Sequence, residues 1–377
     1  MTLGKYIKMP HCRILSRREI VIASLVGGTL LGTSSVAATS KSADKIAKES
    51  KASHPFEGEI LGQGDFRYRA YRHWGLLDRK GYPVRDCHGI TEDRDGRIVL
   101  LTNDTHNNLI AYSKAGEFIS AWENRFPAAH GFEITDQQGE DRYWITDHDR
   151  QVVSMVTAEG REQRRLDPSA VASKYPDLIK YHPTNTAIML DGDFFVSDGY
   201  GSSFIHHLDP DWRYISSFGG EGDGPAHLSG PHAVWIDTRS SKPQLLVCDR
   251  GHNLLKWFSP SGELLRIVEL PNPSREPADG PMPSNVARFK GHRSDHLAVA
   301  CLSGMILILD GRDRIVSVIG GEPPVYIDEK LQPIRPFNYT FNHPHDVHVD
   351  ADGALYVAQF WSNQTYPIKL EPLSATG

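Results

Sequence analysis

The sequence predicts an all-β fold, a β-propeller of six blades, on two observations. A motif recurs six times in which a small residue, often followed by His, leads into an apolar run, an Asp/Gly turn and a second apolar run, as in HGITEDRDGRIVLLTND and PHDVHVDADGALYVAQFWSN. The motifs begin near positions 88, 130, 184, 232, 285 and 345, and most are followed by another strand pair such as LLKWFSPSGELLRIVEL. Four short strands per unit are typical of a propeller blade. A β-sandwich, the alternative, has similar strand spacing but lacks this repeated order of turns.

The last blade is expected to take a strand from the other end of the chain. Its unit shows only three strand-like segments, DVHVD, ALYVAQ and YPIKLEP, whereas an alternating segment at 66–75, FRYRAYRHWG, precedes the first motif. Pairing between the two would close the ring and cover a sheet edge. The predicted propeller therefore covers 61–377.

The first 38 residues have the pattern of an export signal. Basic residues, among them Arg17 and Arg18, precede an uncharged stretch from Ile20 to Ala38 that ends in small residues. This order is typical of a signal peptide, and the paired arginines resemble the bacterial twin-arginine type. An uncleaved anchor is the alternative, although the stretch is weakly apolar for a span of about 20 residues. We expect a periplasmic or extracellular protein with a linker at 39–60 and no stable membrane span after processing.

Composition narrows the classes of partner that the protein can bind. The net charge is −6 and no basic cluster lies beyond the N-terminal segment, which argues against nucleic acid. Beyond that segment the chain has three cysteines, Cys87, Cys248 and Cys301, and an odd number argues against a disulfide framework. We expect a monomer that takes a small-molecule or peptide substrate.

Three histidines open alternate predicted blades. His130, His232 and His345 stand at the start of the second, fourth and sixth motifs. First strands line the central channel of a propeller, and alternate blades of six are about 120° apart. Three imidazoles so placed can hold one Zn²⁺ and leave a fourth position open, although each alone can simply bond to backbone. His88 and His343 are expected to support this site, and His182 to be structural.

The second strand of each blade returns to the face where the first begins, so the ends of the second strands should line the same mouth of the channel. Three of these ends carry Asn103, Tyr200 and Arg250. A tyrosine phenol beside zinc can act as a general base, and an arginine can hold a carboxylate. The alternatives are an aromatic turn residue for Tyr200 and an ion pair with an Asp for Arg250.

Two stretches resemble the catalytic domain of peptidyl-α-hydroxyglycine α-amidating lyase, a propeller of NHL type. They begin PTNTAIMLDGDFFVSDGYG and HPHDVHVDADGALYVAQ, and the likeness extends over roughly 85–365. SDGY, the PHAV and CDR pair and PHDV follow in the order of that family. The resemblance implies a zinc-binding trio, a catalytic tyrosine and an active-site arginine, which match His130, His232, His345, Tyr200 and Arg250.

The resemblance also implies a Ca²⁺ site in the channel, formed by Asp346 with the backbone carbonyls of Ile90 and Phe132. Oxygen ligands suit Ca²⁺. A carboxylate that only stabilises a turn is the alternative for Asp346. Two positions depart from the family: Asn103 replaces a second arginine, and Gly201 replaces a cysteine. The zinc ligands that the resemblance implies are therefore all present, whereas one of the implied catalytic residues is replaced.

Three classes of function follow. A zinc-dependent lyase would break the N–C bond of a carbinolamide to give an amide and glyoxylate. An exported propeller without this chemistry would bind a ligand or protein at the same metal-lined mouth. A metal-dependent lactonase-like propeller is the third class, but such sites use Asp, Glu and Asn ligands rather than three histidines.

Overall fold

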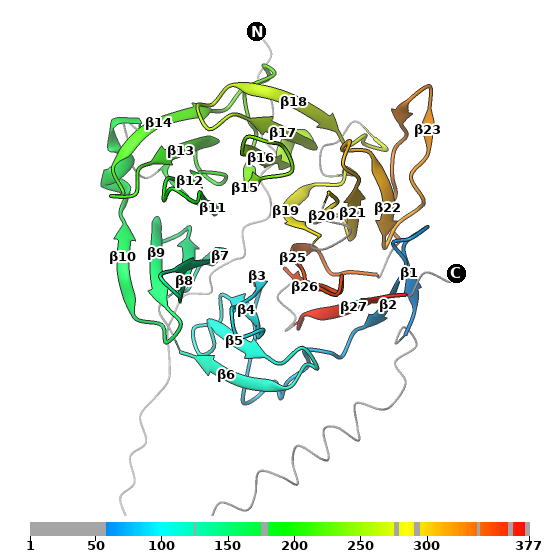
Figure 1. The fold of residues 1–377 in the computed structure, drawn as a ribbon, viewed down its shortest axis with the longest axis horizontal. Coiled ribbons are helices and arrows are strands. Elements are labelled where there is room, and N and C mark those ends of the chain that lie inside the picture. The colour runs from blue at the N-terminus through cyan, green and yellow to red at the C-terminus, as the bar shows by residue number, and fades with distance from the viewer. Residues whose placement is uncertain are drawn as a thin grey trace, which may run out of the picture. The chain divides into compact units, whose positions relative to one another are not determined.

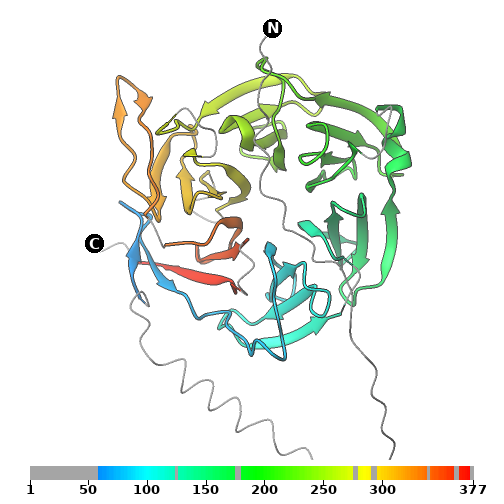
Figure 2. The same ribbon diagram turned by 180° about the vertical axis from the view of Figure 1, so that it is seen from behind.

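The propeller is confirmed. The computed structural model describes residues 58–123, 126–174, 180–274, 279–289, 295–337, 340–360 and 365–373. Within these ranges, six antiparallel sheets surround a central channel (Figure 1, and from behind in Figure 2). The expected signal peptide at 1–38 and most of the expected linker at 39–60 lie outside the described residues.

Each of the first five blades consists of four strands that are consecutive in the chain. The first blade contains β3 (Cys87–Glu92), β4 (Ile98–Thr102), β5 (Leu109–Tyr112) and β6 (Phe118–Trp122). The second contains β7 (Ala129–Gln137), β8 (Glu140–Asp147), β9 (Val152–Thr157) and β10 (Glu162–Leu166). The third contains β11 (Asn185–Ile188), β12 (Phe194–Ser197), β13 (Phe204–Leu208) and β14 (Tyr214–Gly219). The fourth contains β15 (Pro231–Asp237), β16 (Gln244–Asp249), β17 (Leu254–Phe258) and β18 (Leu264–Glu269). The fifth contains β19 (Pro283–Arg288), β20 (Leu297–Cys301), β21 (Met305–Leu309) and β22 (Ile315–Ile319).

The sixth blade joins the two ends of the described chain, as predicted. It contains β25 (Pro344–Val349), β26 (Leu355–Gln359), β27 (Ile368–Pro372), β2 (Tyr68–Tyr71) and β1 (Ile60–Leu61). Strand β2 pairs antiparallel with β27, with Tyr68 opposite Pro372. In Figure 1 the blue β2 lies beside the red β27. The ring is therefore closed by hydrogen bonds between strands about 300 positions apart in the sequence.

The core is divided among the six interfaces between neighbouring blades, because successive side chains of a strand point to opposite faces of its sheet. Strand β16 illustrates this: Leu246 packs toward the fifth blade and Val247 toward the third. Cys87, Cys248 and Cys301 are buried in two of these interfaces as free thiols. In these interfaces they act as small apolar side chains.

The first strands approach one another closely around the channel. A Cβ atom on Gly131 would lie 2.5 Å from the carbonyl oxygen of Thr184 in the next blade. One on Gly89 would lie 2.4 Å from the Cβ of Phe132. Gly89 and Gly131 each follow a channel histidine, and a larger residue at either position would collide with the next blade. This proximity brings each histidine within reach of the next blade.

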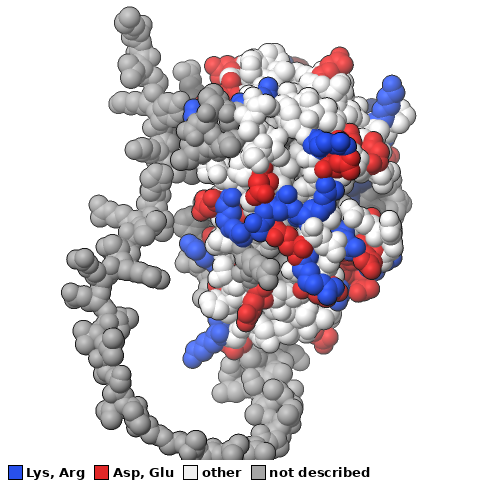
Figure 3. Space-filling model, turned by 90° about the vertical axis from the view of Figure 1, so that its left-hand side faces the viewer, with Lys and Arg blue, Asp and Glu red and all other residues white. Residues whose placement is uncertain are grey.

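In the described ranges, little regular structure lies outside the blades. Two 3-10 helices, η1 (Pro168–Lys174) and η3 (Arg250–His252), and a short hairpin of β23 (Tyr326–Ile327) and β24 (Lys330–Leu331) lie outside the blades. Across the described ranges, no helix is long and apolar enough to cross a bilayer. Basic and acidic side chains are interspersed on the side shown in Figure 3.

Candidate metal centre

The three predicted histidines meet in the channel. The ring centroid of His130 on β7 lies 4.7 Å from that of His232 on β15 and 4.6 Å from that of His345 on β25. The His232 and His345 centroids are 4.5 Å apart. All three side chains are buried. Their placement on alternate blades thus converts a long spacing in sequence into a compact trio.

Each of the three imidazoles makes the same hydrogen bond to the following blade. The Nδ1–H of His130 donates to the carbonyl of Thr184 (2.7 Å), and that of His232 to the carbonyl of Ser284 (2.8 Å). The Nδ1–H of His345 donates to the carbonyl of His88 (2.7 Å). A carbonyl only accepts, so Nδ1 carries the proton and Nε2 keeps its lone pair. Backbone partners of this kind fix the tautomer and orientation of metal-binding histidines.

The trio fits a divalent metal ion. His130 Nε2 and His345 Nε2 are 3.2 Å apart, although neither carries a proton in the tautomer set by the carbonyls. Burial, followed by the charge of His345, holds the pKa of His130 well below its usual value, and burial dominates for His232 and His345 as well. At neutral pH, protonation therefore does not relieve the repulsion between the Nε2 lone pairs. These lone pairs can instead coordinate a cation, and imidazole suits zinc and similar transition metals.

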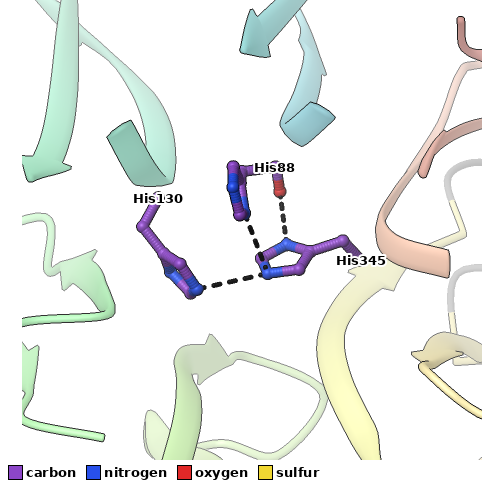
Figure 4. Close-up of side chains that lie close together, drawn as sticks. All are labelled: His88, His130 and His345. Carbon is purple, nitrogen blue, oxygen red and sulfur yellow. Dashed lines mark hydrogen bonds between the residues drawn. The ribbon is translucent and has the colours of Figure 1, made fainter. Parts of the chain in front are cut away.

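His88 is a fourth imidazole in the same cluster. Its Nδ1 lies 3.2 Å from His345 Nε2, and Figure 4 shows it between His130 and His345. His88, His130 and His345 each offer a ligand atom within 4.8 Å of the others. From the sequence, His88 is expected only to support the site. Its position at the start of β3, equivalent to that of the trio, was the signal for its closer involvement.

Tyr200 and Arg250 lie against the trio at the mouth. The Tyr200 phenol, which donates to His130 Nε2 at 2.9 Å, lies 3.5 Å from His232 Nε2. Arg250 Nη1 is 3.5 Å from the same phenol oxygen, and its guanidinium lies 5.2 Å from the centre of the ring. Tyr200 is 38% exposed, so a ligand can reach it from solvent. The structure therefore brings both predicted side chains to the candidate metal centre.

The Asn103 side chain is hydrogen-bonded to Asp86. The Asn103 amide donates to the Asp86 carboxylate (3.0 Å), and the Asp86 backbone N–H donates to the Asn103 side-chain oxygen (2.9 Å). Nearby, the exposed Arg85 was missed by the sequence reasoning. Burial, then His345 and His148, then the charge of Arg85 hold the pKa of His88 well below its usual value. A cation is thus present close to the position where the resemblance implies an arginine.

Two other predicted histidines lie outside the trio. His343 is exposed, and its Nδ1–H donates to the carbonyl of Leu302 (2.6 Å). The Nδ1–H of His182 donates to the carbonyl of His148 (2.8 Å), at the mouth between the second and third blades. His148 itself lies close to Tyr200, with ring centroids 5.3 Å apart, and received no role in the sequence analysis.

The expected calcium site stays a prediction. Asp346 is buried, and its carboxylate accepts hydrogen bonds from the backbone N–H groups of Ile90 (2.9 Å) and Val347 (2.8 Å). Burial raises the pKa of Asp346 to about 7, and burial followed by the charge of Asp346 raises the pKa of Glu133 to about 8. Asp346 thus contacts the backbone N–H of Ile90 rather than the carbonyl that the resemblance implies.

Comparison with known proteins finds relatives of one kind over most of the propeller. No family model matches the chain. It is 24% identical over 278 residues to the peptidyl-glycine alpha-amidating monooxygenase of Mus musculus, which covers 68% of this chain and 25% of that protein. It is 26% identical over 268 residues to the peptidyl-glycine alpha-amidating monooxygenase B of Xenopus laevis, covering 68% and 27%. The chain thus spans about a quarter of the length of these relatives.

Other similarities concern the repeat and the fold. NHL repeat-containing protein 3 of Homo sapiens is 24% identical over 171 residues, covering 41% of this chain and 46% of that protein. A streptogramin B lyase structure superposes with a TM-score of 0.53 at 13% identity, covering 84% of this chain and 99% of that one. These findings define the chain as a six-bladed propeller with a candidate metal centre in its channel. Its relatives include peptidylglycine alpha-amidating enzymes and NHL repeat proteins.

Proposed function

We propose that the protein is a zinc-dependent carbon–nitrogen lyase that cleaves an α-hydroxyglycine-type carbinolamide to an amide and glyoxylate. The sequence similarity to amidating enzymes supports the class of reaction. One structural observation carries the proposal: the Tyr200 phenol oxygen lies within 3.5 Å of His130 Nε2, His232 Nε2 and Arg250 Nη1. The residues proposed as base, metal ligands and carboxylate-binding group thus lie together, and Tyr200 is accessible to solvent.

Arg250 is suited to bind the substrate carboxylate. Within the described ranges its guanidinium forms no ion pair, because the adjacent Asp249 is paired with His252 and Lys256 instead (2.8 Å each). The structure therefore disfavours the alternative in which Arg250 is held by an Asp. A guanidinium binds a carboxylate through two parallel hydrogen bonds, which also orient the attached carbon. That carbon bears the hydroxyl and the amide nitrogen of the substrate.

Tyr200 is the proposed proton carrier. Zinc held by His130, His232 and His345 would supply a Lewis acid beside the substrate hydroxyl. Tyr200, as phenolate, takes the hydroxyl proton, and the O–H electron pair forms the carbonyl of glyoxylate as the C–N bond breaks. The electron pair of that bond passes to nitrogen, which takes the proton from Tyr200. The products are an amide and glyoxylate, with no oxidant or water consumed.

One observation favours a second candidate, a propeller that binds a ligand at the mouth without this chemistry. Asn103, where the resemblance implies an arginine, is neutral and its side chain is hydrogen-bonded to Asp86. A charge that stabilises a reacting centre is commonly worth on the order of 10²–10³ in rate, so its absence can reduce a lyase to a binding protein. The two candidates differ in turnover and share the metal.

Glyoxylate release tests the proposal. Zinc-loaded protein is incubated with an N-acyl-α-hydroxyglycine, and Tyr200→Phe is compared with Tyr326→Phe, a change in the hairpin strand β23 where the Tyr326 hydroxyl bonds to the backbone of Ile315. Loss of a general base commonly costs about 10²–10⁴ in rate, so Tyr200→Phe should be nearly inactive and Tyr326→Phe unchanged. Zinc-containing protein that releases no glyoxylate above background would favour the binding propeller.

A further inference from the structure

We propose a second transition-metal site at the mouth, formed by His148, Asp149 and His182. One ligand atom from each of the three lies within 4.8 Å of the other two. His148 and Asp149 directly follow β8 in the second blade, and His182 precedes β11 in the third. The site therefore bridges two blades. It is separate from the channel trio and does not depend on the lyase reaction.

The His182 imidazole is held with a free nitrogen lone pair. The Nδ1–H of His182 donates to the carbonyl of His148 (2.8 Å), so its Nε2 is unprotonated in the neutral ring. The backbone N–H of His182 also donates to the Asp198 carboxylate (2.7 Å), which fixes the loop that carries the ring. This second-blade carbonyl orients His182 in the way that the carbonyl of Thr184 orients His130 in the channel.

The carboxylate completes the donor set. Asp149 Oδ1 lies 3.0 Å from His148 Nδ1, and Asp149 is exposed, so its side chain can adjust to an ion. Zinc–nitrogen and zinc–oxygen bonds of about 2.0–2.2 Å hold ligand atoms roughly 3–4 Å apart, close to the separation already present. Two imidazoles with one carboxylate favour zinc, copper, nickel or iron over calcium and magnesium.

The position of the site sets its accessibility. The ring centroid of His148 is 5.3 Å from that of Tyr200 and 5.7 Å from that of His130, so the site lies beside the channel centre. His148 and His182 are half-buried, whereas the channel trio is buried. With three protein ligands and coordination positions open to solvent, the second ion should exchange more readily than the channel ion. It would add positive charge to a mouth that already presents Arg250.

Zinc binding measured by equilibrium dialysis tests the site. The full processed protein, with its channel metal in place, is dialysed against a series of buffered free Zn²⁺ concentrations and analysed for zinc per chain. We expect a second equivalent to bind at higher free Zn²⁺ and to be removed by a mild chelator that leaves the first. Cobalt substituted at this step should give a visible absorption that reports nitrogen and oxygen ligands.

Three variants decide the assignment. His182→Gln and Asp149→Asn should each abolish the second binding step and keep the first. His106→Gln is the matched control, because His106 is exposed and lies 3.1 Å from Asp104 but belongs to neither histidine cluster found in the described residues. Melting temperatures near that of the wild type confirm folding, and exposed Asp149→Asn remains informative if His182→Gln unfolds. A second equivalent that persists in Asp149→Asn, or one that never binds to the wild type, would overturn the proposal.

Discussion

His88 and His345 contact each other twice in the channel. The His345 Nδ1–H donates to the His88 backbone carbonyl (2.7 Å), and the His88 ring places its own Nδ1 3.2 Å from His345 Nε2. The first contact orients His345, a proposed zinc ligand, and involves the backbone of His88 but not its side chain. The second places a fourth imidazole next to the atom that would bind zinc. The two contacts can therefore be separated by mutation.

Replacing His88 should leave the metal in place. In His88→Ala the backbone carbonyl that orients His345 remains, and His130, His232 and His345 still provide three nitrogen ligands. We expect about one tightly held zinc per chain in His88→Ala and none in His345→Ala, measured by elemental analysis after dialysis. Loss of zinc in His88→Ala to the level of His345→Ala would show instead that His88 is a ligand.

An arginine at position 103 should raise lyase activity. Asn103→Arg breaks the paired contact with Asp86, at a cost of about 0.5–1.5 kcal/mol of stability for each hydrogen bond lost, and adds a positive charge at the mouth. The rate of glyoxylate release at substrate concentrations well below KM, which reports kcat/KM, should increase. Asn103→Ala controls for the lost contact, since it adds no charge. Equal rates for the two variants would rule out an electrostatic role for this position.

Calcium binding would be visible as thermal stabilisation. An ion bound only to the folded state raises its stability by mass action. If Asp346 holds calcium, EGTA should lower the melting temperature of the wild type, and added calcium should restore it. Asp346→Asn should melt at one temperature under both conditions. If neither EGTA nor calcium changes the melting temperature of the wild type, the calcium site is excluded.

Acid should destabilise the protein partly through His206. Burial, then the charge of Lys174, lowers the pKa of His206 to about 3, whereas an unfolded histidine titrates near 6.5. The unfolded state therefore binds the proton first. The contribution of His206 is fully present above about pH 6.5 and is lost, at up to about 1.4 kcal/mol per pH unit, as the pH falls toward 3.

His206→Gln should therefore flatten the fall in the free energy of unfolding between pH 6 and 4. Glutamine can still bond to Ser217, which contacts His206 Nδ1 at 2.7 Å. Denaturant unfolding across this range is the measurement, with His106→Gln as the exposed control. An unchanged slope in His206→Gln would contradict the assignment.

The fold and the trio were predictable because a propeller repeats one unit around an axis. The motif starts predicted at 130, 232 and 345 lie at the start of β7, β15 and β25, so spacing in sequence fixed angular position. The strand expected at 66–75 is shorter, Tyr68–Tyr71, since the chain then turns and Trp74 packs against Tyr112 and Tyr356. That contact joins three distant segments and has no local signature.

Loop residues were harder to place. The pairing of Asn103 with Asp86 depends on the path of the segment before β3, and the proximity of His148 and His182 depends on two loops from different blades. Neither follows from strand periodicity. Repetition predicts where strands begin, while side-chain partners between blades depend on the three-dimensional approach of their loops.

Zinc content is the most direct test of the central claim that His130, His232 and His345 form the metal centre. Purified protein, dialysed with a mild chelator to remove exchangeable ions, is compared with His232→Ala and with His252→Ala, whose ring pairs with Asp249 outside the channel. His88 remains beside His130 and His345 in His232→Ala, but if zinc is held by the trio and not by His88, only two ligands are left and they hold zinc poorly. We therefore predict about one zinc per chain in the wild type and His252→Ala and almost none in His232→Ala. Equal zinc in His232→Ala and the wild type would contradict the account.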